Sequence, residues 1–561
     1  MSLVPPSRTD RRRWWALACL CLSLILITLD NTVLNVALPT LSRDLHASSS
    51  QLQWIVDSYQ LVFAGLLFSA GSLADRYGRK GMLTAGLVVF GLGTVASAFA
   101  GNADALIGTR AFMGIGGAMI MPSTLSILGT VFPDAAERAR AIAIWAAMSA
   151  VGIALGPVLG GILLAHFGWG SIFMVNVPVV LLALVGGHFV VPTSRDPSPG
   201  RMDPLGSLLS IVGLGGLVFA VIEGPDTGWA SATVVGAAAV GLVAVAAFVA
   251  WERACDHPML DLALFRHRGF SIGSLTLMLG YFGALGTYFL YTQHLQFVLG
   301  YSALRAGVYS VPFAVALVAF SLQTPGLIRR LGTARVAGIG LTVLAAGVAI
   351  RAFSTAGTGY PLLLVSLVVT GIGVGLTIAP STGAIMSSLP PEKAGVGSAI
   401  NDAARQVGAA AGVAVLGSVW ASSYRGGLTR ATVGAGVPQQ ALVASRVSIG
   451  AVAQSARGLP RSVGGELLSA ARAAFVHGSN VANVVGAIVV LAAAALAFRY
   501  MPGVVRPAHP WSIWARRTST SGREPRPPWH EDGGIRRRGD RQRRSESTTG
   551  DALTSTRVTI R

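Results

Sequence analysis

Fourteen long apolar runs, each about the length of a membrane-crossing helix, follow one another along this chain. A helix needs roughly 20 mostly apolar residues to cross the hydrocarbon of a bilayer. The runs span residues 14–38, 51–72, 82–100, 104–128, 139–164, 171–191, 205–222, 231–250, 270–298, 304–323, 334–352, 360–387, 395–421 and 476–500. The sequence therefore predicts an all-α polytopic membrane protein with fourteen transmembrane helices. The first run continues too far, without a small-residue cleavage site, to be a signal peptide.

Charged residues are few and are sorted into the segments between these runs. They make up 12% of the chain, whereas a soluble domain carries about 25%. The formal net charge of +19 could suggest a nucleic-acid partner, but no soluble segment is left to form a duplex-binding domain. We interpret the basic residues as cytoplasmic loops and a basic tail, and expect contact with membrane lipids rather than with nucleic acid.

The distribution of arginine predicts which helix ends face the cytoplasm, because basic residues beside membrane helices favour that side. Arg8 and Arg11–Arg13 precede the first run, and an even number of helices returns the C-terminus to the same side. The loop 422–475 is an exception, since it should lie outside and yet holds six arginines. Its apolar patches could form a partial helix or hairpin. We expect a multi-pass protein of the cell (inner or plasma) membrane with both termini cytoplasmic.

A short charged loop with ordered glycines, Gly71-Ser-Leu-Ala-Asp-Arg-Tyr-Gly-Arg-Lys-Gly81, joins the second and third runs. The bias of basic residues toward the cytoplasm explains its charge, but not the order of its glycines or the aspartate before the arginine. The pattern resembles the signature loop of the major facilitator superfamily. The resemblance implies that Asp75 latches the inward-closed state. It implies a role in conformational gating for Gly71, Asp75, Arg76, Gly78 and Arg79.

A weaker copy of this loop, Pro325-Gly-Leu-Ile-Arg-Arg-Leu-Gly332, follows the second helix of a later half. Two six-helix halves are the architecture of this superfamily, so the resemblance implies a major facilitator fold with two six-helix halves plus two inserted helices. The expected division is a cytoplasmic N-terminus (1–13), a first half (14–191), two linker helices (192–250), a second half (251–500) with the long outer loop 422–475, and a disordered basic cytoplasmic tail (501–561).

Two aspartates lie within predicted membrane helices, where charge is costly and therefore marks a candidate functional site. Asp30 lies in the first helix, where Thr32 and Asn35 could donate hydrogen bonds to it and where burial would let its carboxyl bind a proton. A carboxylate that reaches the outer water is the alternative. Asp57 lies early in the second helix, and a place at the outer interface is as well supported. Both stretches resemble those of the fourteen-helix drug:proton antiporters.

Two further candidates are an arginine in the fourth helix and an acid–base pair in the thirteenth. Arg110 cannot discard its charge, so it needs a carboxylate or carbonyl partner. Its stretch resembles the superfamily's fourth-helix motif, which implies a part in proton transfer, although Met113 replaces the usual glutamine. Asp402 and Arg405 can pair on one helix face, and a merely local ion pair is the alternative. We assign proton coupling or recognition of substrate charge to Asp30, Asp57, Arg110 and Asp402.

The fifth predicted helix carries a string of small residues: Gly152, Gly156, Pro157, Gly160 and Gly161. The four-residue spacing places three of these glycines on one face, where a neighbouring helix can approach closely, and the proline bends the helix. Ordinary small-residue packing is the alternative. The string resembles the superfamily's antiporter motif, which implies export rather than uptake and a gating role for all five residues.

The ninth predicted helix offers candidates for a substrate pocket in Tyr288, Tyr291 and Gln293, because aromatic faces suit aromatic cations. Packing is the commoner use of such residues and is favoured here. The sequence contains no Walker loop, no metal-ligand spacing and no nucleophile constellation. We therefore expect no cofactor, no bound metal and no enzymatic activity.

The resemblance covers about residues 10–500 and points to the fourteen-helix drug:proton antiporter family of the quaternary-ammonium and multidrug resistance type. It implies proton-coupled efflux of hydrophobic, mostly cationic drugs or antibiotics by alternating access. The implied partners of the monomer are protons and small amphipathic substrates. A dedicated exporter of one host secondary metabolite is the alternative, and a non-transporting scaffold or sensor is less favoured because the intramembrane charges are retained.

Overall fold

The computed structural model describes residues 8–194, 203–255, 258, 260–389, 394–432, 437–447 and 449–502, and all regular structure in them is helical. These residues belong to one compact unit. The helices are α1 (Arg8–Asp44), α2 (Ser49–Tyr77), α3 (Arg79–Ala98), α4 (Ala103–Val131), α5 (Ala135–His166), α6 (Ser171–Met174), α7 (Asn176–Val190), α8 (Pro204–Thr227), α9 (Ala232–Ala254), η1 (Leu262–Arg266), α10 (Arg268–Gln293), η2 (His294–Val298), α11 (Ala303–Val308), α12 (Val311–Leu331), α13 (Thr333–Arg351), α14 (Tyr360–Ser387), α15 (Ala394–Ala431), α16 (Gln439–Val447), α17 (Ile449–Arg457) and α18 (Arg461–Tyr500). The expected basic tail lies outside the described residues from residue 503 onward.

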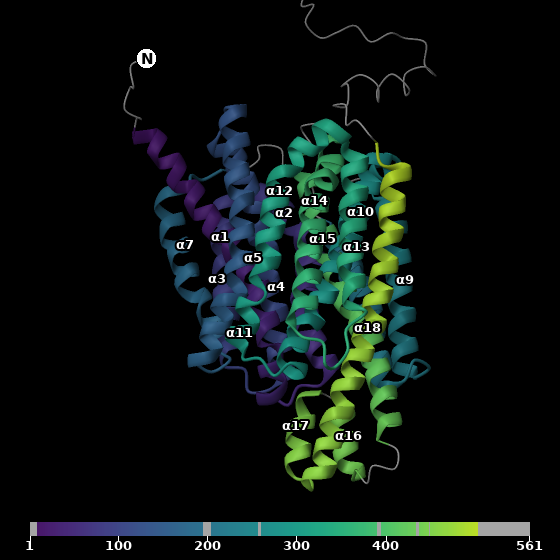
Figure 1. Cartoon of the computed structure of the whole chain (residues 1–561). Helices are drawn as coiled ribbons and strands as arrows, with labels where there is room; N and C mark the ends of the chain where they lie inside the picture. The colour runs from purple at the N-terminus through teal and green to yellow at the C-terminus, as the bar shows by residue number, and fades with distance from the viewer. Residues whose placement is uncertain are drawn as a thin grey trace, which may run out of the picture. The chain divides into compact units, whose positions relative to one another are not determined.

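Each predicted membrane run lies on one of these helices or on a consecutive pair of them. Among the described residues, 13 helices are long and apolar enough to cross a membrane. The fifth run lies on α5, whose described apolar stretch Val151–His166 is shorter. Successive spans alternate in direction, so we name the two ends of the bundle after the ends of α1, the Arg8 end and the Asp44 end (Figure 1). The predicted all-α membrane fold is confirmed.

The turns that follow α2 and α12 are built in the same way. Gly78 and Gly332 have φ values of +112° and +83°, a region that glycine adopts freely and other residues adopt only with strain. Each donates its N–H to the carbonyl four residues earlier, at Ala74 and Ile328, and so ends its helix. The two loops that resemble each other in sequence therefore also have equivalent backbone geometry.

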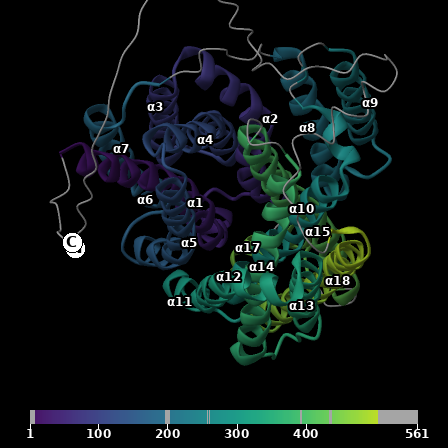
Figure 2. The same ribbon diagram turned by 90° about the horizontal axis from the view of Figure 1, so that it is seen from above.

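Helices α8 and α9 pack against each other beside the remaining spans. We call α1–α7 the first group, in which α1 packs on α5 and α7, and α10–α18 the second group, in which α10 packs on α14, α15 and α18. Helix α8 contacts one helix of each group, α2 and α15. Figure 2 shows α8 and α9 on the side of α2, away from α1 and α5. This position suits two helices inserted between two halves.

The segment 422–475, predicted as a long outer loop, is mostly helical, so its extent is corrected. Helix α15 continues to Ala431, and α18 begins at Arg461. Between them α16 and α17 form two short helices, as the apolar patches suggested (Figure 1). The Tyr424 hydroxyl of α15 donates to the Ser445 carbonyl of α16 at 2.9 Å. The prediction failed because it ended the helices with the apolar runs, whereas a helix can continue through polar turns.

Candidate functional site

A cavity lies between the two groups of helices. Side chains from α1, α2, α4, α5, α10, α12, α14 and α15 line it, and it holds about 1050 Å³, counting the part that is open to solvent. Most of its lining is apolar, and the polar members of the lining include Thr28, Asn31, Thr32, Gln60, Ser310, Asp402, Arg405 and Gln406. The cavity thus offers a mostly apolar wall with a few polar groups, which suits an amphipathic organic molecule.

One carboxylate and one guanidinium form the charged part of the cavity wall. Nη1 of Arg405 lies 3.5 Å from Oδ1 of Asp402 on the same helix face. The guanidinium also stands 5.1 Å from the centre of the Tyr281 ring on α10. The Asp402 side chain is 9% exposed and that of Arg405 is 25% exposed. Because its contact with Arg405 is long, the carboxylate can accept a second cationic partner.

Aromatic side chains form another part of the wall. Phe63, Tyr288 and Phe313 line the cavity, and the ring centres of Tyr288 and Phe313 lie 5.8 Å apart. Tyr291 and Gln293, by contrast, are not among the lining residues. Each instead donates a hydrogen bond to a backbone carbonyl, at 3.0 Å and 3.1 Å. Of the three predicted pocket residues, only Tyr288 therefore faces the cavity, because the other two side chains take part in helix packing.

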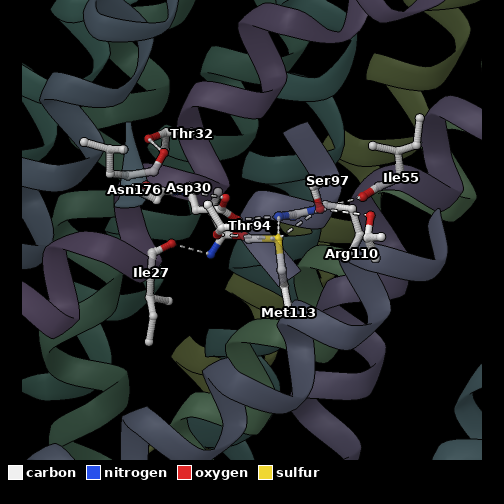
Figure 3. Close-up of polar contacts among 12 residues, drawn as sticks. Ile27, Asp30, Thr32, Ile55, Thr94, Ser97, Arg110, Met113 and Asn176 are labelled. Carbon is white, nitrogen blue, oxygen red and sulfur yellow. Dashed lines mark hydrogen bonds and ion pairs between the residues drawn. The ribbon is translucent and has the colours of Figure 1, made fainter. Parts of the chain in front are cut away.

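Asp30 and Arg110 form an ion pair inside the first group (Figure 3). The Asp30 side chain is 2% exposed and that of Arg110 is 1% exposed. Nη1 of Arg110 donates to Oδ2 of Asp30, and Nδ2 of Asn176 donates to Oδ1 at 3.1 Å. Nε of Arg110 donates to the Ile55 carbonyl at 3.2 Å. The arginine thus has both the carboxylate and the carbonyl partner that its charge requires, and the network joins α1, α2, α4 and α7.

The hydrogen bonds predicted for Asp30 from its own helix are wrong. The Thr32 hydroxyl donates to the Thr28 carbonyl at 3.0 Å, and the Asn35 amide donates to the Asn31 carbonyl at 2.8 Å. Short polar side chains in a helix bond readily to the carbonyl four residues earlier. The burial of Asp30 also excludes the alternative of a carboxylate that reaches the outer water.

Asp57 is buried at 0% exposure, and neither of its carboxylate oxygens has a hydrogen-bond partner among the described residues. Gln53 and Gln60 lie four residues before and three after it, on the same face of α2, and their amide oxygens are also buried without a partner there. Gln60 reaches the cavity. An unpaired carboxylate anion is expensive in such surroundings. This burial does not fit a place at the outer interface.

Comparison with known proteins agrees with this architecture. A family model described as Major Facilitator Superfamily matches residues 20–413. The multidrug efflux pump LfrA of Mycolicibacterium smegmatis is 40% identical over 490 residues, which cover 87% of this chain and 96% of that protein. The chain belongs to the major facilitator superfamily. It is therefore a multi-pass membrane transporter, and its bacterial relatives place it in the plasma membrane.

Other relatives and solved structures match this transporter over most of their length. The methyl viologen resistance protein SmvA of Salmonella typhimurium is 37% identical over 84% of this chain and 94% of its own. The tetracenomycin C resistance and export protein of Streptomyces glaucescens is 31% identical over 88% and 92%. A bacterial homologue of the human lysosomal transporter Spinster, solved in an inward-facing and occupied conformation, has the same fold, with a TM-score of 0.62 at 18% identity, over 88% of this chain and 98% of that one.

The glycine string of α5 brings this helix of the transporter against two neighbours. Gly152, Gly156 and Gly160 face α1, and a β-carbon on either of the first two would overlap a threonine side chain there. Gly161 instead faces the backbone of α11, and Pro157 lines the cavity. The prediction that three of the glycines share one closely packed face is confirmed, and the string also reaches the second group and the cavity.

The loop 71–81 of the transporter is bonded to its own group of helices. Oδ1 of Asp75 accepts a hydrogen bond from Nε of Arg79 at 2.9 Å, and Arg79 donates to the Thr130 hydroxyl of α4 at 2.9 Å. The Arg76 side chain is exposed, and a β-carbon on Gly71 would meet its nearest neighbour only at 3.6 Å. Within the described part of the chain, Asp75 makes no ion pair with the second group, so its role as a latch stays a prediction.

Hydrogen bonds join the two groups of helices at the Asp44 end. The Thr292 hydroxyl of α10 donates to the Asn35 carbonyl of α1 at 2.7 Å. The Gln296 amide of η2 donates to the Val36 carbonyl at 2.8 Å. Close backbone approach of α5 to α11 adds to these contacts. The Asp44 end is therefore tied together across the two groups.

Sequence reasoning missed Asn176, Tyr59 and Tyr281 as members of the site. Asn176 stands in the segment Trp169–Pro178, where an asparagine two residues before a proline resembles a superfamily pattern, so a signal was present. The Tyr59 ring lies 4.5 Å from the Arg110 guanidinium. Nothing in the sequence separates Tyr59 and Tyr281 from the other tyrosines, because their contacts are with distant segments.

Proposed function

We propose that the protein exports hydrophobic, mostly cationic drugs or antibiotics in exchange for protons, by alternating access of one central cavity. The observation that carries the proposal is the cavity between the two groups, with one carboxylate in a largely apolar and aromatic wall. An apolar body would pack on Phe63, Tyr288 and Phe313, and a cationic group would approach Asp402. The export function named for relatives such as LfrA supports the direction of transport.

The substrate's positive charge would compete with Arg405 for Asp402. The present contact between them is long and partly exposed, so that its replacement by a substrate cation costs little. The displaced guanidinium keeps a partner in the Tyr281 ring. Asp402 would thus recognise the substrate charge, and proton coupling is assigned to the other carboxyls.

The proton would act on the Asp30–Arg110 ion pair. Both carboxylate oxygens of Asp30 accept hydrogen bonds from donors, one of them charged, and charge-assisted hydrogen bonds of this kind are strong. Proton binding would remove the charge that holds Arg110, and would loosen four helices at once. The arrangement described above is then the proton-released, substrate-loading form. Asp57, which has no donor, would keep its proton in this form.

The sidedness follows from the arginine distribution, with the Arg8 end inside and both termini cytoplasmic. The bonds at the Asp44 end then close the outer side, as expected of a form that loads substrate from the cytoplasm. The Asp75 loop would engage the second group only after the inner side closes. The protein would act as a monomer in contact with membrane lipids.

Ethidium efflux from proteoliposomes under an imposed pH gradient tests this function. We expect uphill efflux that a protonophore abolishes, with Asp402→Asn slow and the cavity-lining Gln406→Glu still active. Efflux that is indifferent to the protonophore would contradict proton coupling.

A dedicated exporter of one metabolite is the second candidate, and it is favoured by the similarity to the tetracenomycin C resistance and export protein. A panel of structurally unrelated dyes separates the two functions. Transport of most members supports multidrug efflux, whereas transport of none, together with proton release on addition of a single natural product, supports the dedicated exporter.

A further inference from the structure

Arg351, the last residue of α13, is a buried cation with no acidic partner among the described residues. It is 2% exposed. Its Nη1 donates to the Thr287 carbonyl at 2.7 Å, and its guanidinium lies 4.9 Å from the Tyr291 ring centre. Its Nε has no hydrogen-bond partner in the described ranges. A guanidinium keeps its charge under all ordinary conditions. A buried charge without a counter-charge is strongly destabilising. An anion bound beside this arginine would therefore stabilise the folded protein.

Helix α18 places an unpartnered amide level with the arginine. Nδ2 of Asn480 donates to the Ser354 carbonyl at 2.8 Å, and a β-carbon on Gly486 would lie 3.6 Å from the Val348 side chain. These two contacts fix the register of α18 on α13. Asn483, midway between the two α18 positions, therefore lies opposite the arginine, which is midway between Val348 of α13 and Ser354, three residues beyond the end of that helix. Asn483 is 0% exposed, and neither atom of its amide has a hydrogen-bond partner among the described residues.

Two more buried polar groups lie one and two helical turns from this level along α18. Ser479 precedes Asn483 by four residues on the same face of α18, and its hydroxyl has no hydrogen-bond partner in the part of the chain that the structure describes. The ring centre of His294 of η2 lies 6.0 Å from that of Phe475, which is one turn before the serine. The Nε2 of His294 finds no hydrogen-bond partner within the described segments. Both side chains are 2% exposed or less. The cluster thus gathers in the wedge where α10, α13 and α18 pack together.

We propose that Arg351, Asn483 and Ser479 form a binding site for a small monovalent anion, chloride under ordinary conditions, with His294 one helical turn beyond Ser479. Guanidinium, amide, hydroxyl and imidazole N–H groups are all donors, and donors around a fixed positive charge suit a halide. None of the four residues lines the central cavity. The site is therefore separate from the substrate path, and its occupant is a small ion rather than a charged group of the substrate.

The anion would act as a fixed counter-charge that stabilises the second group of helices. Because it would bind the folded state and not the unfolded chain, stability would rise with halide concentration and then level off. The purified full-length protein is melted in detergent in sodium gluconate, with chloride or bromide replacing gluconate at constant ionic strength. We expect a saturable upward shift of the melting temperature with each halide, and anomalous scattering from bromide beside Arg351 in crystals.

Variants separate this site from general salt effects. Arg351→Met and Asn483→Leu should lose the halide-dependent shift, and Arg305→Met, which removes an exposed arginine near the same end, should keep it. If Arg351→Met does not fold, the halide-dependent shift of the melting temperature is measured on Asn483→Leu and Ser479→Ala instead, and both should lose it. If the melting temperature of the unaltered protein does not change with halide concentration, water alone solvates the cluster and the proposal is overturned. A full halide response in Asn483→Leu would place the ion elsewhere and would overturn it equally.

Discussion

Removal of either partner of the Asp30–Arg110 pair should destabilise the protein far more than removal of both. The two side chains are 2% and 1% exposed, so each single variant leaves its partner buried without a counter-charge. Breaking a buried ion pair in this way costs about 3–5 kcal/mol. Asp30→Asn, Arg110→Met and the double variant form a thermodynamic cycle, read from unfolding in detergent at neutral pH. We expect a coupling of about 3 kcal/mol or more, which is the signature of residues in direct contact.

The loss of unfolding free energy caused by leaving Asp30 charged and unpaired in Arg110→Met has an upper bound that depends on pH. The stranded aspartate can take up a proton, which costs an ordinary aspartic acid about 4 kcal/mol at pH 7 and about 1.5 kcal/mol at pH 5. The destabilisation should therefore shrink by more than half as the pH falls, whereas that of Asp30→Asn should stay constant. Additive single effects, or a cost of Arg110→Met that grows on acidification, would refute the reasoning.

Three further predictions follow from single contacts. Asp402→Asn should weaken binding of a cationic dye at least tenfold and leave a neutral dye of similar size unaffected, as measured by fluorescence titration; equal losses for both would contradict a charge-recognition role. Gly78→Ala should lower stability by about 1–2 kcal/mol because of its positive φ, whereas Gly81→Ala, with open space and an ordinary helical φ, should not; equal effects would argue against the turn geometry. Gly156→Ala should impair folding or transport because its β-carbon would meet α1, and Gly129→Ala, with nothing within 4 Å, is the control; full efflux by both variants would remove the close-packing argument.

The apolar runs and the paired loops predicted the fold well because they are local signals. A run of about 20 apolar residues fixes a span without knowledge of its neighbours. Gly78 and Gly332 mark matching turns because the positive φ at both positions favours glycine over other residues. The same local reasoning misjudged the segment between α15 and α18, where helices continue past the apolar residues.

The site was less predictable because its partners come from distant parts of the chain. The sequence marked Asp30 and Arg110 separately, as charges that had to be explained. It could not show that Asp30 of α1 and Arg110 of α4 form an ion pair. It predicted instead that Thr32 and Asn35 donate hydrogen bonds to Asp30. Those side chains bond within their own helix. Arg351 escaped notice for a related reason, since a charge at the end of an apolar run resembles an ordinary residue of a loop.

Proton release on substrate binding tests the exchange of substrate for protons most directly. The purified protein is placed in weakly buffered detergent solution, and a pH-sensitive dye follows the addition of ethidium while ethidium fluorescence follows binding. The account predicts proton release that saturates together with binding, and its loss in Asp30→Asn. Saturating binding with no proton release from the unaltered protein, or undiminished release from Asp30→Asn, would contradict it.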